Sequence, residues 1–117
     1  MQMSELKTLA EKVVVFRDER DWKQFHNPKD LALSLMLESA ELLELFQWKD
    51  ADATEQVAAA QKTALSDELA DVLYYVLLMA HDLNIDLSQA LTAKLAKNAE
   101  KYPVDKARGS NKKYTEL

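Results

Sequence analysis

The chain has 117 residues, of which 48% are hydrophobic and 30% are charged, with a formal net charge of −5. This length favours a single domain, residues 1–117, and one Gly with two Pro supplies too few turn residues for an all-β fold. The absence of Cys excludes disulfides and thiol chemistry, and the acidic balance argues against binding to a nucleic acid polymer.

The N-terminal half begins with two predicted helices. Residues 3–20 carry apolar side chains at helical spacing, which predicts an amphipathic first helix. Asn27 before Pro28 is typical of a helix start, with Asn as the cap and Pro at the first helical position. We therefore expect a second helix from Pro28 to about Trp48, apolar on most of its faces.

The remaining elements follow from the same signals. The more polar stretch 49–61 is interpreted as a loop leading to a third helix over residues 64–83, which Asn84 is expected to end. Asp86 can cap a fourth helix, which stops before a tail at residues 103–117. The sequence thus predicts an all-α helical bundle of about four main helices. Because the second and third helices are apolar nearly all round, we expect it to be oligomeric.

Nothing in the sequence predicts contact with a membrane. The N-terminus MQMSELK lacks the apolar core of a signal peptide. The longest apolar run, residues 72–80, is far shorter than the ~20 residues that a membrane span needs. We therefore expect a cytoplasmic protein without a membrane partner.

Two acidic pairs interrupt the apolar helices, Glu38 with Glu41 in ESAE and Glu68 with Asp71 in ELAD. Residues three apart share a helix face, and no Lys or Arg lies three or four positions from any of these acids. Unpaired carboxylates in a dry site are costly and require a partner. If the two helices pack antiparallel, the acids can converge, and oxygen ligands without His or Cys suit Mg²⁺ or Mn²⁺.

Two other interpretations of these acids stay open from the residues alone. They can belong to a solvated helix face, where an acidic pair is common. They can also belong to a di-iron carboxylate bundle, but such sites use Glu-x-x-His pairs and neither pair here has a His three residues on.

ESAE and ELAD, separated by 26 residues, resemble the ExxE…ExxD signature of the all-α nucleoside triphosphate pyrophosphatases, the MazG-like family. ERDWKQFHNP, ELFQWK, KYP at residues 101–103 and the KYTEL ending are similar to its dCTP pyrophosphatase branch. This resemblance, over roughly residues 15–117, implies Mg²⁺-dependent hydrolysis of dCTP or modified dCTP to dCMP and pyrophosphate, which cleanses the nucleotide pool. The alternatives are a broader or different specificity, such as dUTP or non-canonical purine nucleotides, and a non-catalytic helical oligomerisation module.

The resemblance also implies roles for the acids. Glu38, Glu41, Glu68 and Asp71 would hold Mg²⁺, with Mn²⁺ as a substitute, and the metal would bind the triphosphate while water attacks the α-phosphorus. Glu38 and Glu41 are assigned the catalytic role, with Glu38 as the candidate for orienting the water. The family further implies a homodimer or a homotetramer built as a dimer of dimers.

Aromatic side chains provide candidates for a base pocket, because aromatic rings stack on bases. Trp48 lies two helical turns after Glu41, and Tyr75 lies one turn after the second acidic pair, so both are expected on the acid-bearing faces. A Trp at helical spacing is more often part of a core, and a His before Asn-Pro can be a surface turn residue. The candidates that the resemblance supports are Trp22, His26, Trp48 and Tyr75.

Polar side chains nearer the C-terminus provide a second set of substrate-binding candidates. The fourth helix presents a polar face on which Lys can bind phosphates and Asn can bind a base or sugar. The segment around Gly109 could close over the phosphates. The alternatives are a solvated Lys-rich face and a mobile basic tail. The candidates are Lys94, Asn98, Lys101, Tyr102, Arg108 and Lys113.

Overall fold

The computed structural model describes residues 4–117, and over that range it is helical and contains no strand. This confirms the predicted all-α class, with α1, α2, α4 and α5 as its four main helices. Residue 3, where the first helix was expected to begin, lies outside the described residues. The helices are α1 (Glu5–Asp18), α2 (Pro28–Glu44), α3 (Ala51–Ala60), α4 (Lys62–Asp82), α5 (Leu87–Lys101) and α6 (Val104–Ala107), with 3-10 turns at Lys23–Phe25 and Tyr114–Glu116.

The chain divides into two compact units, Met1–Asn84 and Ile85–Leu117. The first unit holds α1 to α4, and the second holds α5, α6 and the C-terminal 3-10 turn. The single domain expected from the chain length stays a prediction. Among residues 4–117 no helix combines the length and the apolar character that crossing a membrane requires.

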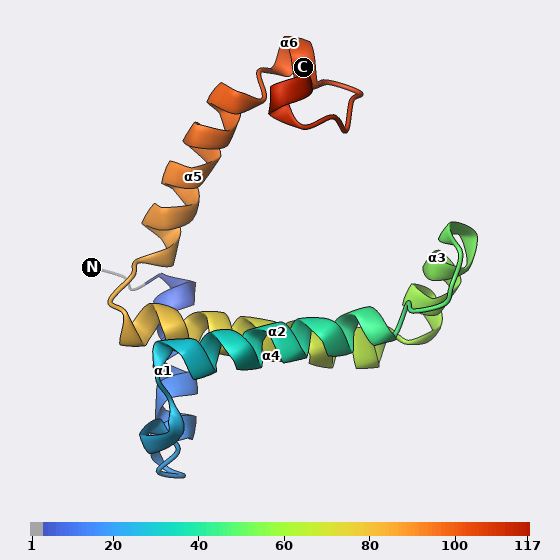
Figure 1. Ribbon diagram of the computed structural model, residues 1–117. Helices are drawn as coiled ribbons and strands as arrows, with labels where there is room; N and C mark the ends of the chain where they lie inside the picture. The colour runs from blue at the N-terminus through green and yellow to red at the C-terminus, as the bar shows by residue number, and fades with distance from the viewer. Residues whose placement is uncertain (1–3) are drawn as a thin grey trace. The chain divides into compact units, whose positions relative to one another are not determined.

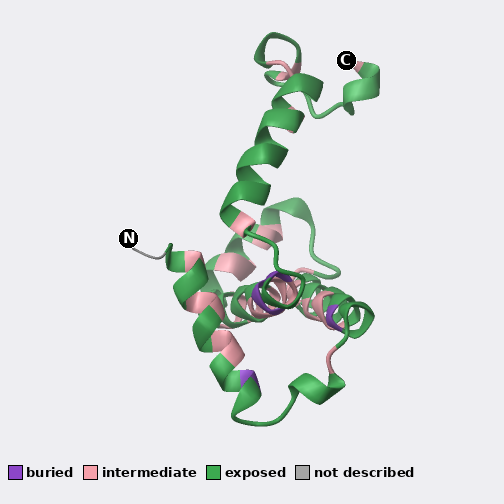
Figure 2. Cartoon of the chain, turned by 90° about the vertical axis from the view of Figure 1, so that its left-hand side faces the viewer, coloured by how far each residue is buried: buried purple, intermediate pink, exposed green. Residues whose placement is uncertain are grey.

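The first unit is built on α2 and α4, which pack side by side and run antiparallel (Figure 1). Leu31 of α2 and Leu77 and Leu78 of α4 are at most 2% exposed, and they form the centre of this packing. Figure 2 shows that the buried positions concentrate on these two helices. α1 packs against α4, and α3 joins the end of α2 to the start of α4.

The predicted helix boundaries at Asn27, Asn84 and Asp86 are confirmed. The Asn27 Oδ1 accepts the Asp30 N–H at 2.9 Å, and Pro28 occupies the first turn of α2. The Asp86 side chain likewise caps α5. Asn84 follows the end of α4 with φ 56°, a left-handed conformation that Asn tolerates better than most residues.

The second helix ends earlier than the sequence predicted. α2 stops at Glu44, four residues before Trp48. The chain then tightens into 3-10-type turns, in which the Phe46 N–H bonds the Leu43 carbonyl at 2.9 Å. Trp48 itself has φ 67°, which no α-helix contains. The expectation that Trp48 continues the helix face of Glu41 is therefore wrong.

The stretch 49–61 was expected to be a loop and instead contains α3. Its helix is rich in Ala, the residue with the highest helix propensity, and its weak hydrophobic pattern hid that preference. The Asp50 Oδ1 accepts the Ala53 N–H at 2.8 Å and caps the helix. α4 starts directly after α3, at Lys62, two residues before the predicted start.

Large apolar side chains on the two central helices remain exposed in the single chain. On α2, Leu33, Met36, Leu37 and Leu43 are between 47% and 64% exposed. On α4, Leu69 is 56% exposed. These side chains bury little area within their own unit, although the helices that carry them are its centre.

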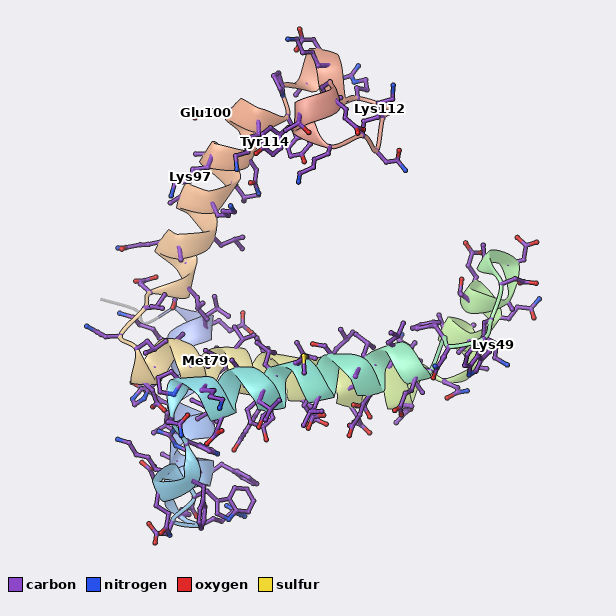
Figure 3. All side chains as sticks on the ribbon, viewed as in Figure 1. Lys49, Met79, Lys97, Glu100, Lys112 and Tyr114 are labelled. Atoms are coloured by element: carbon purple, nitrogen blue, oxygen red, sulfur yellow. The ribbon has the colours of Figure 1, made fainter. Side chains whose placement is uncertain are left out.

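The second unit folds its C-terminal segment back on α5. The Tyr114 ring packs edge to face on the Tyr102 ring, with centroids 5.9 Å apart. The Lys101 Nζ lies 4.9 Å from the centre of the Tyr114 ring. Figure 3 shows Tyr114 beside the end of the helix on which Lys97 and Glu100 are labelled.

Candidate metal centre and nucleotide site

The four predicted metal ligands come from the two central helices. Glu38 and Glu41 lie on α2, and Glu68 and Asp71 lie on α4. Because these helices run antiparallel and in contact, their acidic faces meet, and one carboxylate oxygen of each residue lies within 4.8 Å of the others. The structure thus brings the two pairs together as their spacing predicted. Within residues 4–117 none of the four carboxylates forms an ion pair.

Two of these carboxylates are partly withdrawn from water and lack a partner. Glu38 and Glu68 are half-buried, whereas Glu41 and Asp71 are exposed. Among the described atoms, the Oε2 of Glu38 and the Oε2 of Glu68 are buried and make no hydrogen bond. Buried polar atoms are normally satisfied, so these two oxygens mark a place that could bind a ligand.

The electrostatics of the cluster agree with this view. Burial, the neighbouring Glu41 carboxyl and the charges of Asp71 and Glu68 raise the pKa of Glu38 to about 7. Burial and the nearby Glu41 and Asp71 carboxylates also raise the pKa of Glu68. Both shifts show that negative charge is crowded here, and a divalent cation would neutralise it. The cluster offers only hard oxygen ligands, so it could bind a metal ion that prefers oxygen.

The structure links Trp22 to Tyr75 through a row of aromatic rings. The Trp22 ring packs edge to face on Phe16 at 5.9 Å, and Phe16 packs in the same way on Tyr74 at 6.2 Å. Tyr74 in turn contacts Tyr75, with ring centroids 5.0 Å apart. Tyr75 lies one helical turn after Asp71 on α4, so this aromatic row runs toward the helix segment that carries the second acidic pair.

His26 lies in the segment that connects α1 to α2. Its side chain is half-buried, and its Nδ1 is buried without a hydrogen-bond partner among the described residues. Burial, with a smaller contribution from the positive charge of Arg17, lowers the pKa of His26. The lowered pKa favours the neutral form of the imidazole, whose buried Nδ1 could accept or donate one hydrogen bond.

Trp48 is placed differently from the other aromatic candidates. Its side chain is 91% exposed, and it lies in the turn between α2 and α3. It makes no ring contact with the aromatic row in the described part of the chain. An exposed indole gains little free energy from packing, and a left-handed backbone conformation is unfavourable for Trp.

The six C-terminal candidates all belong to the second unit. Lys94, Asn98 and Lys101 lie on α5, and only Asn98 is half-buried. The rings of Tyr102 and Tyr114 and the ammonium of Lys101 form the contacts already described. Arg108 borders a surface hollow with Val104 and Asp105, and Lys113 is exposed just before the last 3-10 turn.

Sequence reasoning missed an ion pair between α1 and α4. The fully buried Arg17 donates from Nη1 and Nη2 to the two Asp82 carboxylate oxygens, at 2.7 and 2.9 Å. A signal was present, because Arg17 lies four residues after Val13 and so continues the apolar stripe of α1. An arginine on a buried stripe requires an acidic partner on the facing helix.

Three comparisons with known proteins agree with one another. The model of the MazG-like family matches residues 33–117. The chain is 46% identical over 104 residues to the dCTP pyrophosphatase 1 of Rattus norvegicus and 45% identical to that of Homo sapiens, covering 87% of this chain. It spans only 61% of the length of these curated relatives. A crystal structure of a pyrophosphatase from Archaeoglobus fulgidus matches with a TM-score of 0.83 and 38% identity, covering 88% of this chain and 96% of that one.

Proposed function

The chain belongs to the MazG-like family, and we propose that it is a Mg²⁺-dependent nucleoside triphosphate pyrophosphohydrolase that acts on dCTP or a modified dCTP. The observation that carries this proposal is the convergence of four carboxylates without a counter-charge at one point between α2 and α4. The names of the curated relatives support dCTP as the substrate. The products would be dCMP and pyrophosphate, which would remove unwanted nucleotides from the pool.

The acidic cluster would supply the metal ligands. Glu38, Glu41, Glu68 and Asp71 would hold Mg²⁺, or Mn²⁺ in its place, each through a carboxylate oxygen. The bound cation would neutralise triphosphate charge and make water more acidic. Hydrolysis then consumes one water, which forms a bond to the α-phosphorus as the bond to the bridging oxygen breaks.

Glu38 is the residue of this chain best suited to take the proton from that water. Its Oε2 is buried and free of hydrogen bonds, so it can accept a proton without breaking another contact. Glu41 completes the acidic face of the same helix.

The aromatic row and His26 would bind the base. Trp22 and Tyr75 offer ring faces for stacking, and the free Nδ1 of His26 offers a hydrogen bond. Trp48, exposed at the end of α2, would add a stacking surface. The resemblance to the family supports six further substrate-binding candidates, Lys94, Asn98, Lys101, Tyr102, Arg108 and Lys113.

The enzyme would act in the cytoplasm as a homodimer or a homotetramer. Support comes from the apolar side chains that a single chain leaves exposed on α2 and α4, including Met36, Leu43 and Leu69. Large exposed apolar patches mark interaction sites such as protein–protein interfaces.

The first experiment measures pyrophosphate release from a panel of deoxy- and ribonucleoside triphosphates, with Mg²⁺ and with a chelator. We expect release from dCTP that requires Mg²⁺ and is lost in Glu41→Gln. The matched control is Glu44→Gln, a change of the same kind on the same helix outside the cluster, which should retain activity. Release from another nucleotide would retain the reaction and correct the specificity. No release from any nucleotide would favour a helical oligomerisation module.

A further inference from the structure

The Arg17–Asp82 pair ties the end of α1 to the end of α4. Arg17 is 0% exposed, and its guanidinium bonds both oxygens of Asp82 in a bidentate arrangement. This geometry fixes direction as well as distance, because two parallel hydrogen bonds resist rotation. The Asp82 carboxylate also accepts a contact from the His81 Nδ1 at 3.1 Å, so it is held from both sides.

The backbone of Arg17 is bonded to the residue that begins the aromatic row. The Arg17 carbonyl accepts the Trp22 N–H at 3.2 Å and the Arg20 N–H at 3.2 Å. One residue therefore contacts α4 through its side chain and Trp22 through its backbone. The turn after α1, which carries Trp22, cannot shift relative to α4 without breaking one of these bonds.

The neighbouring side chains extend this link. Phe16 precedes Arg17 and packs between Trp22 and Tyr74 of α4. The Arg20 guanidinium lies 3.7 Å from the Phe16 ring centre and covers it from outside. Trp22 is thus linked to α4 in two ways. Its backbone bonds Arg17, which is paired with Asp82 of α4, and its ring contacts Phe16, which packs on Tyr74 of α4.

We propose that Arg17 and Asp82 are positioning residues for the base pocket, which hold Trp22 in register with the part of α4 that carries Glu68, Asp71 and Tyr75. The inference rests on the proposed function, because it takes Trp22 to be a wall of the pocket. Neither residue of the pair needs to touch substrate. Their effect is on nucleotide affinity through the placement of an aromatic ring, and the chemical step at the acidic cluster is left unchanged.

The kinetic test uses two variants that both remove the bidentate bond but differ in their expected stability. Asp82→Asn weakens the pair and should lower the melting temperature and raise KM for dCTP about tenfold, with kcat within about twofold. Arg17→Met combined with Asp82→Leu removes both charges and leaves none unpaired, so the melting temperature should return toward wild type. KM should stay raised in this double variant, because no bidentate bond fixes the turn. A KM that recovers together with stability would overturn the proposal.

A second readout follows Trp22 without any enzyme assay. The chain has two Trp residues, so in a Trp48→Phe background the emission reports Trp22 alone. Adding Asp82→Asn should shift the emission and increase quenching by acrylamide. The matched control is Leu65→Ala, which lies on α4 about 25 Å before Asp82 and should destabilise without moving the emission. Equal emission changes in the two variants would mean a general loss of packing and would contradict the proposal.

The outcomes separate this inference from the proposed function. If the wild-type chain hydrolyses dCTP and Asp82→Asn leaves KM unchanged, the positioning role is wrong and the function stands. If the wild-type chain hydrolyses no nucleotide, the proposed function fails and the inference fails with it.

Discussion

The acidic cluster and the Arg17–Asp82 pair place carboxylates in similar surroundings with opposite results. Both include residues of α4, and both withdraw carboxylates from water. At the ion pair, hydrogen bonding to Arg17 lowers the pKa of Asp82 to about 2. At the cluster, burial and like charges raise the pKa of Glu38 to about 7. A carboxylate neutralised within the chain stabilises the fold, whereas carboxylates gathered without a cation keep their binding capacity for a ligand.

The largest expected effect comes from removing one carboxylate of the acidic cluster. Glu68→Gln removes one of the four proposed ligands and should lower pyrophosphate release about 100-fold or more, because even outer partners of a metal site cost 10–100-fold. The metal-free protein should not be destabilised, since the change relieves repulsion. Steady-state kinetics and thermal melting with a chelator measure the two effects. The exposed neighbour Asp67 provides the control, and Asp67→Asn should match wild type in both assays.

The next largest effect comes from removing the charge of Asp82 in the ion pair. Asp82→Asn should lower the free energy of unfolding by about 2–3 kcal/mol, because it leaves the buried guanidinium of Arg17 without its charge partner. The loss should be the same with and without Mg²⁺, in contrast to Glu68→Gln. Urea denaturation measures it. Asp18, whose side chain is 54% exposed and 3.6 Å from the Arg17 Nε, is the control. A cost of more than about 1 kcal/mol for Asp18→Asn would show that the stabilisation of Arg17 is not specific to Asp82.

The two sites should also separate along the pH axis. The raised pKa of Glu38 means that its contribution to stability is fully present below about 4.5 and is lost as pH rises through about 7. The lowered pKa of Asp82 gives the opposite sign, with a contribution present above about 3.8 and lost as pH falls through about 2. Chemical denaturation of the metal-free protein from pH 2 to pH 8 should show both windows.

Single variants assign each window to its residue. Glu38→Gln should reduce the slope in the neutral window and leave the acidic window unchanged, and Asp82→Asn should flatten the acidic window alone. Saturating Mg²⁺ should reverse the slope in the neutral window, because metal ligands bind in their deprotonated form. A neutral slope that Mg²⁺ leaves unchanged would contradict metal binding at the cluster.

The smallest effect concerns Trp48, which combines φ 67° with a side chain that is 91% exposed. Trp48→Gly should stabilise the fold by about 1 kcal/mol, because Gly adopts this conformation without strain. If Trp48 stacks on the base, the same variant should raise KM for dCTP. Asn84→Gly, at φ 56°, is the control and should change neither property appreciably. A stabilised variant with wild-type KM would remove Trp48 from the pocket.

Local signals in the sequence predicted the parts of the fold that local chemistry decides. Asn27 with Pro28 and Asp86 set helix starts because caps act within a single turn. The end of α2 was mispredicted, because the residues after Glu44 are still mostly apolar and carry no sequence signal for the 3-10 turns that they form. The Ala-rich segment of α3 was mispredicted because its hydrophobic periodicity is weak while its helix propensity is high.

The acidic cluster of the candidate site was predictable because each of its two helices carries an acidic pair on one face. The two acidic pairs were visible because the members of each lie three residues apart, and their convergence followed once two helices packed antiparallel. The bond between Arg17 and Asp82 joins residues 65 positions apart, and no periodicity connects them. Only the presence of Arg17 on an apolar stripe announced that a partner exists. The contacts among Trp22, Phe16 and Tyr74 are likewise set by packing of α1 on α4.

The division of the acidic cluster between α2 and α4 makes binding competence a property of the finished fold. Each helix supplies two carboxylates, and the two pairs are separated by 26 residues of chain. An unfolded or truncated copy therefore presents only half of the ligands in one place and has little affinity for a divalent ion. On the proposed function, a newly made chain would stay inert toward nucleotides until both halves have met, and damage to either helix would remove the chemistry together with the structure.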